Sequence, residues 1–100
     1  MTHKKRKKKN YSETNGSFQL YYDRVVDFHG YYPDKAVLEL EEIVFSSPPN
    51  SAILVIHGVG TGILKQALRN FIISTEYVSS YEFGEEANLP GGAGVILVYT

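Results

Sequence analysis

The 100-residue sequence contains no cysteine and no tryptophan. The absence of cysteine excludes disulfide bridges and thiolate metal sites, which suits a reducing compartment. No apolar run approaches the roughly 20 residues that a membrane span needs, and the first residues lack the apolar core of a secretory signal. We therefore expect a soluble, intracellular protein without membrane contact, cytoplasmic or, in a eukaryotic source, nuclear.

Positive charge is scarce beyond the first nine residues. Lys4 to Lys9 are all basic, six in number, whereas beyond Asn10 four basic residues stand against eleven acidic ones, a net charge of −7. Residues 1–17 show almost no apolar periodicity, which predicts a disordered basic and polar arm before a single folded domain over residues 18–100. Such an arm binds phosphate backbones without reading sequence, or it serves only as a solubilising tail.

Hydrophobic periodicity over the rest of the chain predicts an α/β fold with the order βαβαββ. A first helix is expected to begin at Pro33, a residue that tolerates the first helical position. Thr61 is expected to cap a second helix, with Ile63 opening its buried stripe. The predicted strands lie at residues 25–29, 52–56, 78–83 and 95–99.

The pair His-Gly occurs twice, at His29 and at His57, each time after an apolar strand and before a helix. Carboxyl ends of parallel strands share one edge of a sheet with helix N-termini, so both loops are expected to meet there. Asp27 stands two positions before His29 on the same strand face, where a carboxylate orients an imidazole and raises its basicity. The alternative is that Asp27 only caps a turn or accepts a backbone hydrogen bond.

The second His-Gly pair opens a glycine-rich loop with Gly58, Gly60 and Gly62. Glycines allow positive φ and let several N–H groups point at an anion, notably phosphate, at a helix N-terminus. The loop is not a Walker loop, because no Gly-Lys-Ser/Thr follows. It also departs from the dinucleotide fingerprint, since Ile63 stands where a third glycine belongs.

Basic and aromatic side chains flank these loops. Lys65 and Arg69 fall outside the apolar stripe of the second helix, so they are predicted to face solvent, as phosphate contacts or as ordinary solvated charges. Tyr31 and Tyr32 follow the first His-Gly pair and either stack on an unpaired base or cover the edge of the core.

Three motifs together resemble the Smr (small MutS-related) domain family. They are Asp-Phe-His-Gly at 27–30, His-Gly-Val-Gly-Thr-Gly at 57–62 and Gly-Gly-Ala-Gly at 91–94, and the resemblance covers residues 23–100. It implies a two-layer βαβαββ sandwich with a mixed four-stranded sheet and two helices, similar to the C-terminal domain of bacterial translation initiation factor three. It also implies nucleic-acid binding and, in several members, endonuclease activity on DNA or RNA.

The resemblance also implies roles for individual positions. Asp27 and His29 match a Leu-Asp-Leu-His motif linked to nuclease activity. Members often carry Lys or Arg where this chain has Val59, a departure that weakens phosphate contact. The positions linked to substrate binding and activity are His57, Gly58, Gly60, Thr61 and Gly62, and the glycine of the last motif maps to Gly91, Gly92 and Gly94.

Phosphodiester cleavage is the activity these residues suggest. On RNA, His29 oriented by Asp27 takes the proton of a 2′-hydroxyl while His57 protonates the departing 5′-oxygen, and no metal is needed. On DNA, water must be activated, helped by a divalent cation such as Mg²⁺ held partly by Asp27. One alternative is a non-catalytic module that binds nucleic acid, the ribosome or a larger repair or translation assembly, which the acidic body favours. A more distant one is a two-histidine, one-carboxylate metal centre.

Overall fold

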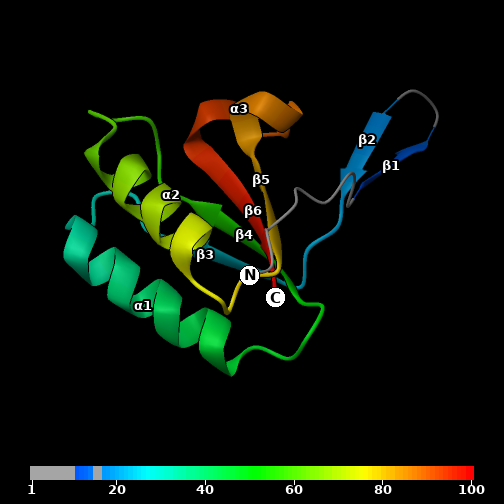
Figure 1. Cartoon of the computed structure of the whole chain (residues 1–100). Helices are drawn as coiled ribbons and strands as arrows, with labels where there is room; N and C mark the ends of the chain where they lie inside the picture. Colours follow the sequence, from blue (N-terminus) through cyan, green and yellow to red (C-terminus); the bar gives the residue numbers. More distant parts are fainter. Residues whose placement is uncertain (1–10, 15–16) are drawn as a thin grey trace.

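The computed structural model describes residues 11–14 and 17–100 (Figure 1). Its main sheet has the strand order β3-β4-β6-β5. β3 (Arg24–Asp27) and β4 (Ala52–Ile56) are parallel, whereas β6 (Val95–Tyr99) is antiparallel to both β4 and β5 (Ser80–Phe83). The predicted mixed four-stranded sheet is therefore confirmed.

Two helices pack against one face of this sheet (Figure 1). α1 (Pro33–Ser46) has Pro33 in its first turn, as predicted, where its missing N–H needs no partner. α2 (Ile63–Ser74) is preceded by Gly62, which occupies the N-cap with φ of 89°. The N-cap position is therefore Gly62 and not Thr61 as predicted, although the hydroxyl oxygen of Thr61 accepts a hydrogen bond from the Ile63 amide at 3.4 Å. Ile63 is 65% exposed, so the buried stripe begins after it.

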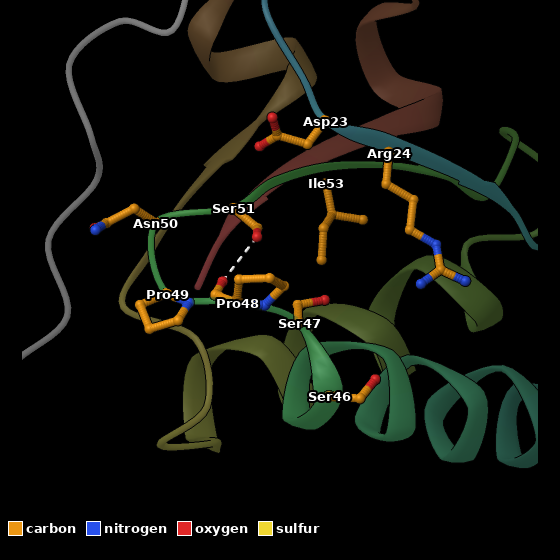
Figure 2. Close-up of a pocket in the computed structure, with 9 residues that line it drawn as sticks. All are labelled: Asp23, Arg24, Ser46, Ser47, Pro48, Pro49, Asn50, Ser51 and Ile53. Carbon is orange, nitrogen blue, oxygen red and sulfur yellow. Dashed lines mark hydrogen bonds between the residues drawn. The ribbon is translucent and has the colours of Figure 1, made fainter.

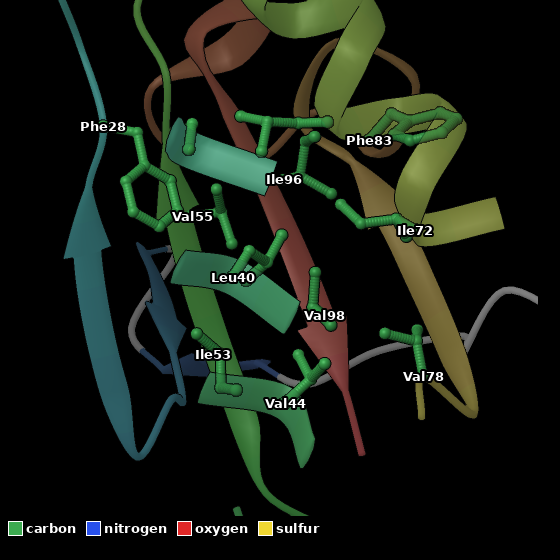
Figure 3. Packing of buried hydrophobic residues seen from close by; sticks show 12 residues of the cluster. Phe28, Leu40, Val44, Ile53, Val55, Ile72, Val78, Phe83, Ile96 and Val98 are labelled. Atoms are coloured by element: carbon green, nitrogen blue, oxygen red, sulfur yellow. The ribbon is translucent and has the colours of Figure 1, made fainter. Parts of the chain in front are cut away.

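β4 and β6 are buried on both faces. The face toward the helices forms one apolar cluster with α1 and α2, including Leu40, Val55 and Ile96 (Figure 3). The opposite face carries a second cluster, in which Leu97 packs with Leu89. Burial on both sides explains why residues 52–56 are continuously apolar instead of alternating with polar residues.

Two short elements stand between β5 and β6, where the sequence predicts only a loop. They are α3 (Gly84–Ala87) and the 3-10 turn η1 (Gly92–Gly94). A Cβ at Gly84 would lie 2.1 Å from the carbonyl oxygen of Gly92, so only glycine allows these segments to approach so closely. This packing holds α3 beside the edge of the sheet at which β6 begins.

A small antiparallel hairpin precedes the main sheet, formed by β1 (Tyr11–Thr14) and β2 (Ser17–Leu20). Residues 11–14 and 17 of the stretch predicted to be disordered belong to this hairpin, whose strand pairing satisfies backbone groups in a way that composition does not reveal. Residues 1–10 of the predicted arm lie outside the described residues. Within the part of the chain that the structure describes, no helix is both long and apolar enough to cross a bilayer.

Candidate functional site

The three motifs meet at one edge of the main sheet. β3 and β4 end in register, so the loops that carry His29 and His57 leave the sheet side by side. The amides of His57 and Gly58 both donate to the carbonyl oxygen of Gly94, at 2.9 and 3.2 Å. These bonds tie the start of β6 to the end of β4, and they bring the third motif to the edge that the sequence predicts.

Asp27 and His29 form an exposed pair at this edge. Nδ1 of His29 lies 2.8 Å from Oδ1 of Asp27, and the backbone amide of His29 donates to the same oxygen at 3.0 Å. The side chains of His29 and Asp27 are 73% and 49% exposed. The hydrogen bond from the His29 amide, followed by the one from its ring, lowers the pKa of Asp27. Asp27 is therefore ionised at neutral pH, holds the proton of His29 on Nδ1 and leaves Nε2 as the basic atom.

Asp27 thus has both of the roles that the sequence offered as alternatives. It accepts a backbone hydrogen bond at the end of a strand, and it orients an imidazole. β3 ends at Asp27 and not at His29 as predicted, although the Phe28 amide still donates to the carbonyl oxygen of Ile56 at 2.7 Å.

His57 has a different environment, because its side chain is buried, with 4% of the residue exposed. Its Nδ1 lies 2.6 Å from the carbonyl oxygen of Gly58. A carbonyl only accepts, so Nδ1 carries the proton and Nε2 is left as an acceptor. Nε2 is buried and has no hydrogen-bond partner among the described residues.

The pKa of His57 is lowered, mainly by burial, and the charges of Lys65 and Arg69 lower it further. Burial disfavours the charged ring because the imidazolium loses its hydration. The predicted role of His57 as the proton donor to the leaving oxygen needs an imidazolium with access to the substrate. The geometry opposes that role, because the ring is neutral and its second nitrogen is buried.

The glycine loop has the backbone conformation that the pattern predicts. Gly58, Gly60 and Gly62 have φ values of 75°, 40° and 89°. A Cβ at Gly58 would lie 3.5 Å from Cβ of His29, so the loop runs directly beside the exposed histidine.

Several of the glycine amides already have partners within the protein. The N–H groups of Gly58, Gly92 and Gly94 each donate to a backbone carbonyl. These three amides are therefore not available to the phosphate group that the sequence assigns to them. Among the predicted backbone positions, residues 60–62 and Gly91 are the ones whose assignment the geometry does not oppose.

Lys65 and Arg69 do not face solvent as predicted. Both pair with Glu85 of α3: Nζ of Lys65 lies 2.5 Å from Oε2, and Arg69 contacts Oε1. Their side chains are 22% and 20% exposed, and the guanidinium group lies 3.9 Å from the ring centre of Phe83. Glu85 is not among the predicted site residues; its signal in the sequence is an acidic pair, Glu85 and Glu86, between the last two predicted strands.

A hollow of about 270 Å³ adjoins the glycine loop. Asp27 and His29 do not line it, so the site consists of an exposed acid–base pair and an adjacent hollow that contains His57. The residues that line the hollow come from both His-Gly loops and the start of α2: Gly30, Tyr31, Tyr32, residues 57–62, Leu64 and Lys65.

A larger hollow of about 510 Å³ lies at the other end of β4, between β3 and the end of α1 (Figure 2). Its polar groups are used to shape the connecting loop: Ser51 Oγ donates to the Pro48 carbonyl at 2.7 Å, and Asp23 Oδ2 accepts from the Ala52 amide at 2.7 Å. It contains none of the predicted site residues.

The donor atoms of the site do not form the predicted metal centre. Within the described ranges, no group of three or more His, Asp or Glu side chains is placed to hold a metal ion. Nδ1 of His57 is bonded to a carbonyl and its Nε2 is buried, so this ring does not join Asp27 and His29 as a ligand.

Comparison with known proteins connects this geometry to one family. The family model for the Smr domain matches residues 26–100. The chain is 33% identical over 75 residues to Endonuclease MutS2 of Clostridioides difficile, a match that spans 73% of this chain and 9% of the relative. Endonuclease MutS2 of Caldicellulosiruptor bescii is 33% identical over 78 residues, 76% of this chain and 10% of the relative. The chain thus matches only about a tenth of the length of these relatives.

A solved structure gives the same result for the fold. The crystal structure of the Smr domain of Thermus thermophilus MutS2 superposes with a TM-score of 0.67 at 28% identity. The superposition covers 77% of this chain and 96% of that chain, so the similarity extends over nearly the whole of the solved domain.

Proposed function

This chain belongs to the Smr domain family, and from that premise we propose that it is a nucleic-acid-binding domain with endonuclease activity. The relatives it matches are named as endonucleases, although it spans a small share of their length. The observation that carries the proposal is the Asp27–His29 pair, joined at 2.8 Å and exposed at the edge of the sheet. An oriented, accessible imidazole is what a general base requires.

RNA is the substrate for which this geometry needs the fewest additional groups. Nε2 of His29 takes the proton of a 2′-hydroxyl, and that oxygen attacks the adjacent phosphorus. The bond to the 5′-oxygen breaks, and a water molecule at this exposed edge protonates the leaving oxygen. The hydroxide left behind takes the proton held on Nε2 of His29, which restores the neutral base. The products are a 2′,3′-cyclic phosphate and a 5′-hydroxyl. The protein contributes the base, its orientation and its accessibility.

On DNA, the same edge would have to activate water. A divalent cation such as Mg²⁺ would supply a more acidic water molecule when bound, with Asp27 as its carboxylate ligand. Oδ1 of Asp27 already accepts two hydrogen bonds from His29, so Oδ2 is the atom left for a cation. Within the described residues no group of three or more His, Asp or Glu side chains is placed to complete a cation site around that oxygen, which favours RNA.

Cleavage assays on an end-labelled structured RNA and on a supercoiled plasmid, each with and without a chelator, test this proposal. We expect RNA cleavage that the chelator does not reduce. His29→Ala should lower the rate by about 100-fold or more, the usual contribution of a positioned base. Asp27→Asn should also lower it, since the uncharged amide oxygen is a weaker acceptor for Nδ1–H of His29 and the amide NH2 can instead donate to Nδ1, which selects the wrong tautomer.

Asp34→Asn is the matched control, because Asp34 is an exposed carboxylate in the first turn of α1 and its loss changes the net charge equally. It should cleave like the wild type. Cleavage that persists in His29→Ala would show that this pair is not the catalytic centre.

The charge of the protein favours a second candidate function, a binding module that does not cut. Residues beyond Asn10 carry four basic side chains against eleven acidic ones. Two of those four, Lys65 and Arg69, pair with Glu85. Phosphate affinity would then come mainly from the basic arm, and the domain would bring nucleic acid, a ribosome or a repair or translation assembly to a partner. Binding without cleavage in the assays above would favour this function.

A further inference from the structure

We propose that the outer face of α1 is a docking surface for a basic, amphipathic segment of a partner protein. This outer face consists of Leu38, Glu41, Glu42 and Phe45, together with the neighbouring Tyr77. The inference rests on the second candidate function, a binding module, and it names the class of partner that such a module would recruit. It places that partner away from the candidate catalytic pair.

The four helical residues of the outer face form one exposed stripe of α1. They recur at i, i+3, i+4 and i+7, which is the spacing of residues that share one side of a helix. Leu38 is 59% exposed and Phe45 is 67% exposed. The opposite side of α1 packs on the sheet through buried residues such as Leu40 and Val44. The two exposed apolar side chains are therefore additional to those with which α1 packs on the core.

Tyr77 extends this apolar surface beyond the helix. Its ring makes an edge-to-face contact with the ring of Phe45, with 5.0 Å between the centres and 70° between the planes. Tyr77 follows the end of α2 and is 37% exposed. Aromatic pairs favour this arrangement, so the contact holds the exposed Phe45 ring in one orientation. A partner therefore meets an anchor whose position is already set, which lowers the entropy that binding costs.

Exposed carboxylates stand among these apolar groups. Two lie within the stripe and one directly precedes Tyr77: Glu41, Glu42 and Glu76. None of the three forms an ion pair with another described residue. The one basic residue of α1 is Lys35, whose ammonium group lies 5.0 Å from the centre of the Tyr31 ring near the start of the helix. The outer face thus combines apolar anchors with negative charge that the described residues do not neutralise.

This charge determines which class of partner suits the outer face. Carboxylates repel nucleic acids and anionic membrane surfaces. A second copy of this chain, placed face to face on the same surface, would oppose like charges, which costs free energy. A protein segment that carries Lys or Arg beside apolar side chains fits, because its apolar groups bury against Leu38 and Phe45 while its cations face the carboxylates.

The outer face and the edge of the sheet that carries the motifs can be occupied at the same time. α1 follows directly after Tyr32, which lines the hollow beside the glycine loop, whereas Phe45 lies in the last turn of the helix. At 1.5 Å per residue, Phe45 is about 18 Å along the helix axis from Pro33. A partner held at Phe45 and Tyr77 therefore leaves the candidate catalytic pair open to nucleic acid, as a recruiting module requires.

Fluorescence anisotropy on the full chain tests the class of partner with synthetic peptides. The probe is a helical peptide of about 18 residues, five turns long, built of Leu and Lys with the leucines on one face. One control peptide has Glu in place of each Lys, and the other has the same composition in an order that scatters the leucines. At about 0.15 M salt, which screens long-range attraction, we expect the probe to bind about tenfold more tightly than either control. Equal affinity for the three peptides would overturn the proposal.

Substitutions of exposed residues locate the binding surface without altering the core. Phe45→Ala should weaken binding of the Leu/Lys probe about tenfold, because it removes an aromatic anchor. Glu41→Gln combined with Glu42→Gln should also weaken it and reduce its salt dependence. Ile63→Ala is the matched control, since Ile63 is 65% exposed at the start of α2, the opposite end of that helix from Tyr77. If the control weakened binding as much as Phe45→Ala, the outer face of α1 would not be the specific surface.

Photo-crosslinking from position 45 identifies the natural occupant in cells that produce the full chain. A photoreactive residue in place of Phe45 should label a segment of another protein in which Lys or Arg stands beside apolar residues. Glu41→Gln combined with Glu42→Gln should reduce that labelling. Crosslinks mainly to nucleic acid, to a second copy of the chain or to acidic segments would overturn the proposal, as would the absence of crosslinks.

RNA cleavage separates this inference from the proposed enzymatic function. Phe45 lies outside the candidate catalytic pair and the adjacent hollow, so Phe45→Ala should cleave RNA like the wild type. Selective binding of the Leu/Lys probe by a protein that does not cut would refute the endonuclease activity and keep the docking surface. Cleavage by a protein that does not distinguish the three peptides would refute the docking surface alone.

Discussion

His29 and His57 follow similar strands and each precedes a glycine, yet the fold gives them opposite environments. His29 bonds to a carboxylate and its side chain is 73% exposed. His57 bonds to a backbone carbonyl and is 4% exposed. A neighbouring carboxylate stabilises the protonated form of an imidazole ring, whereas burial beside a neutral carbonyl favours its uncharged form. The two residues therefore have different chemistry, a base at the surface and an acceptor inside.

The burial of His57 makes the stability of the protein depend on pH. Because its pKa in the folded state is lowered from 6.5, the unfolded chain binds more protons than the folded one just below that value. The stabilisation that this residue contributes is complete above about pH 6.5 and is lost as the pH falls toward the lowered pKa. We expect the free energy of unfolding by urea to fall between about pH 7.5 and about pH 5.5 in the wild type, and to fall less in His57→Asn.

Asp27 affects the free energy of unfolding in a different pH range from His57. Its pKa is lowered from 3.8, so its contribution is present above that value and is lost only at more acidic pH. An equal loss of stability near pH 6 in the wild type and in His57→Asn would assign the titration to a group other than His57.

Among the secondary-structure elements, α3 determines whether Lys65 and Arg69 of α2 are available to contact nucleic acid. Glu85 uses one carboxylate oxygen for Lys65 and the other for Arg69. The three side chains are half-buried, so this cluster is less screened by solvent than an exposed pair. α3 itself is held in place by the close approach of Gly84 to Gly92.

Replacing Glu85 should strengthen the affinity for nucleic acid. Glu85→Gln keeps the size of the side chain and removes its charge, which frees the ammonium group of Lys65 for a phosphate. We expect the affinity to rise about tenfold and the slope of log affinity against log salt to steepen by about one, the value for one additional phosphate contact on a duplex. Filter binding at several salt concentrations measures both quantities.

Glu76→Gln is the control for this prediction, because Glu76 is exposed after α2 and its loss changes the net charge equally. If the affinity for nucleic acid rises only because the protein is less negatively charged, it should rise equally in both variants. If the two variants gained affinity equally, Glu85 would have no specific effect on Lys65 and Arg69.

At the scale of the whole molecule, positive and negative charge are separated along the chain. Residues 4–9 are all basic, whereas beyond Asn10 four basic residues stand against eleven acidic ones. A polyanion is attracted to the first segment and repelled by the second. The arm is thus expected to supply most of the affinity, and the edge of the sheet most of the selectivity.

Removal of residues 1–9 tests this division of roles. Loss of up to six cations should flatten the salt dependence by several units of slope and weaken binding strongly at low salt. The chemical step takes place at the edge of the sheet, so KM should rise while kcat at saturating RNA stays near that of the full chain. An unchanged salt slope would show that the arm does not contact phosphate, and a fall in kcat alone would place it in the chemical step.

The sequence by itself determined the βαβαββ order of the main sheet with its two long helices, and the edge at which the motifs meet. The apolar run at 52–56, Pro33 at the start of a helix and the glycines after His57 are local features, and local backbone preferences place them correctly. The exposed Asp27–His29 pair was equally predictable, because residues two apart on a strand share a face.

Only the tertiary structure decided which side chains are accessible and which partners they have. It buried His57, it engaged the amides of Gly58, Gly92 and Gly94, and it placed Glu85 against two cations that the helical pattern directs to solvent. The physical reason is sequence separation: Lys65 and Glu85 lie 20 positions apart, and the contact exists only because the fold places α3 within side-chain reach of α2. Burial and ion pairing depend on contacts between residues that are far apart in the sequence, and a local sequence pattern does not specify such contacts.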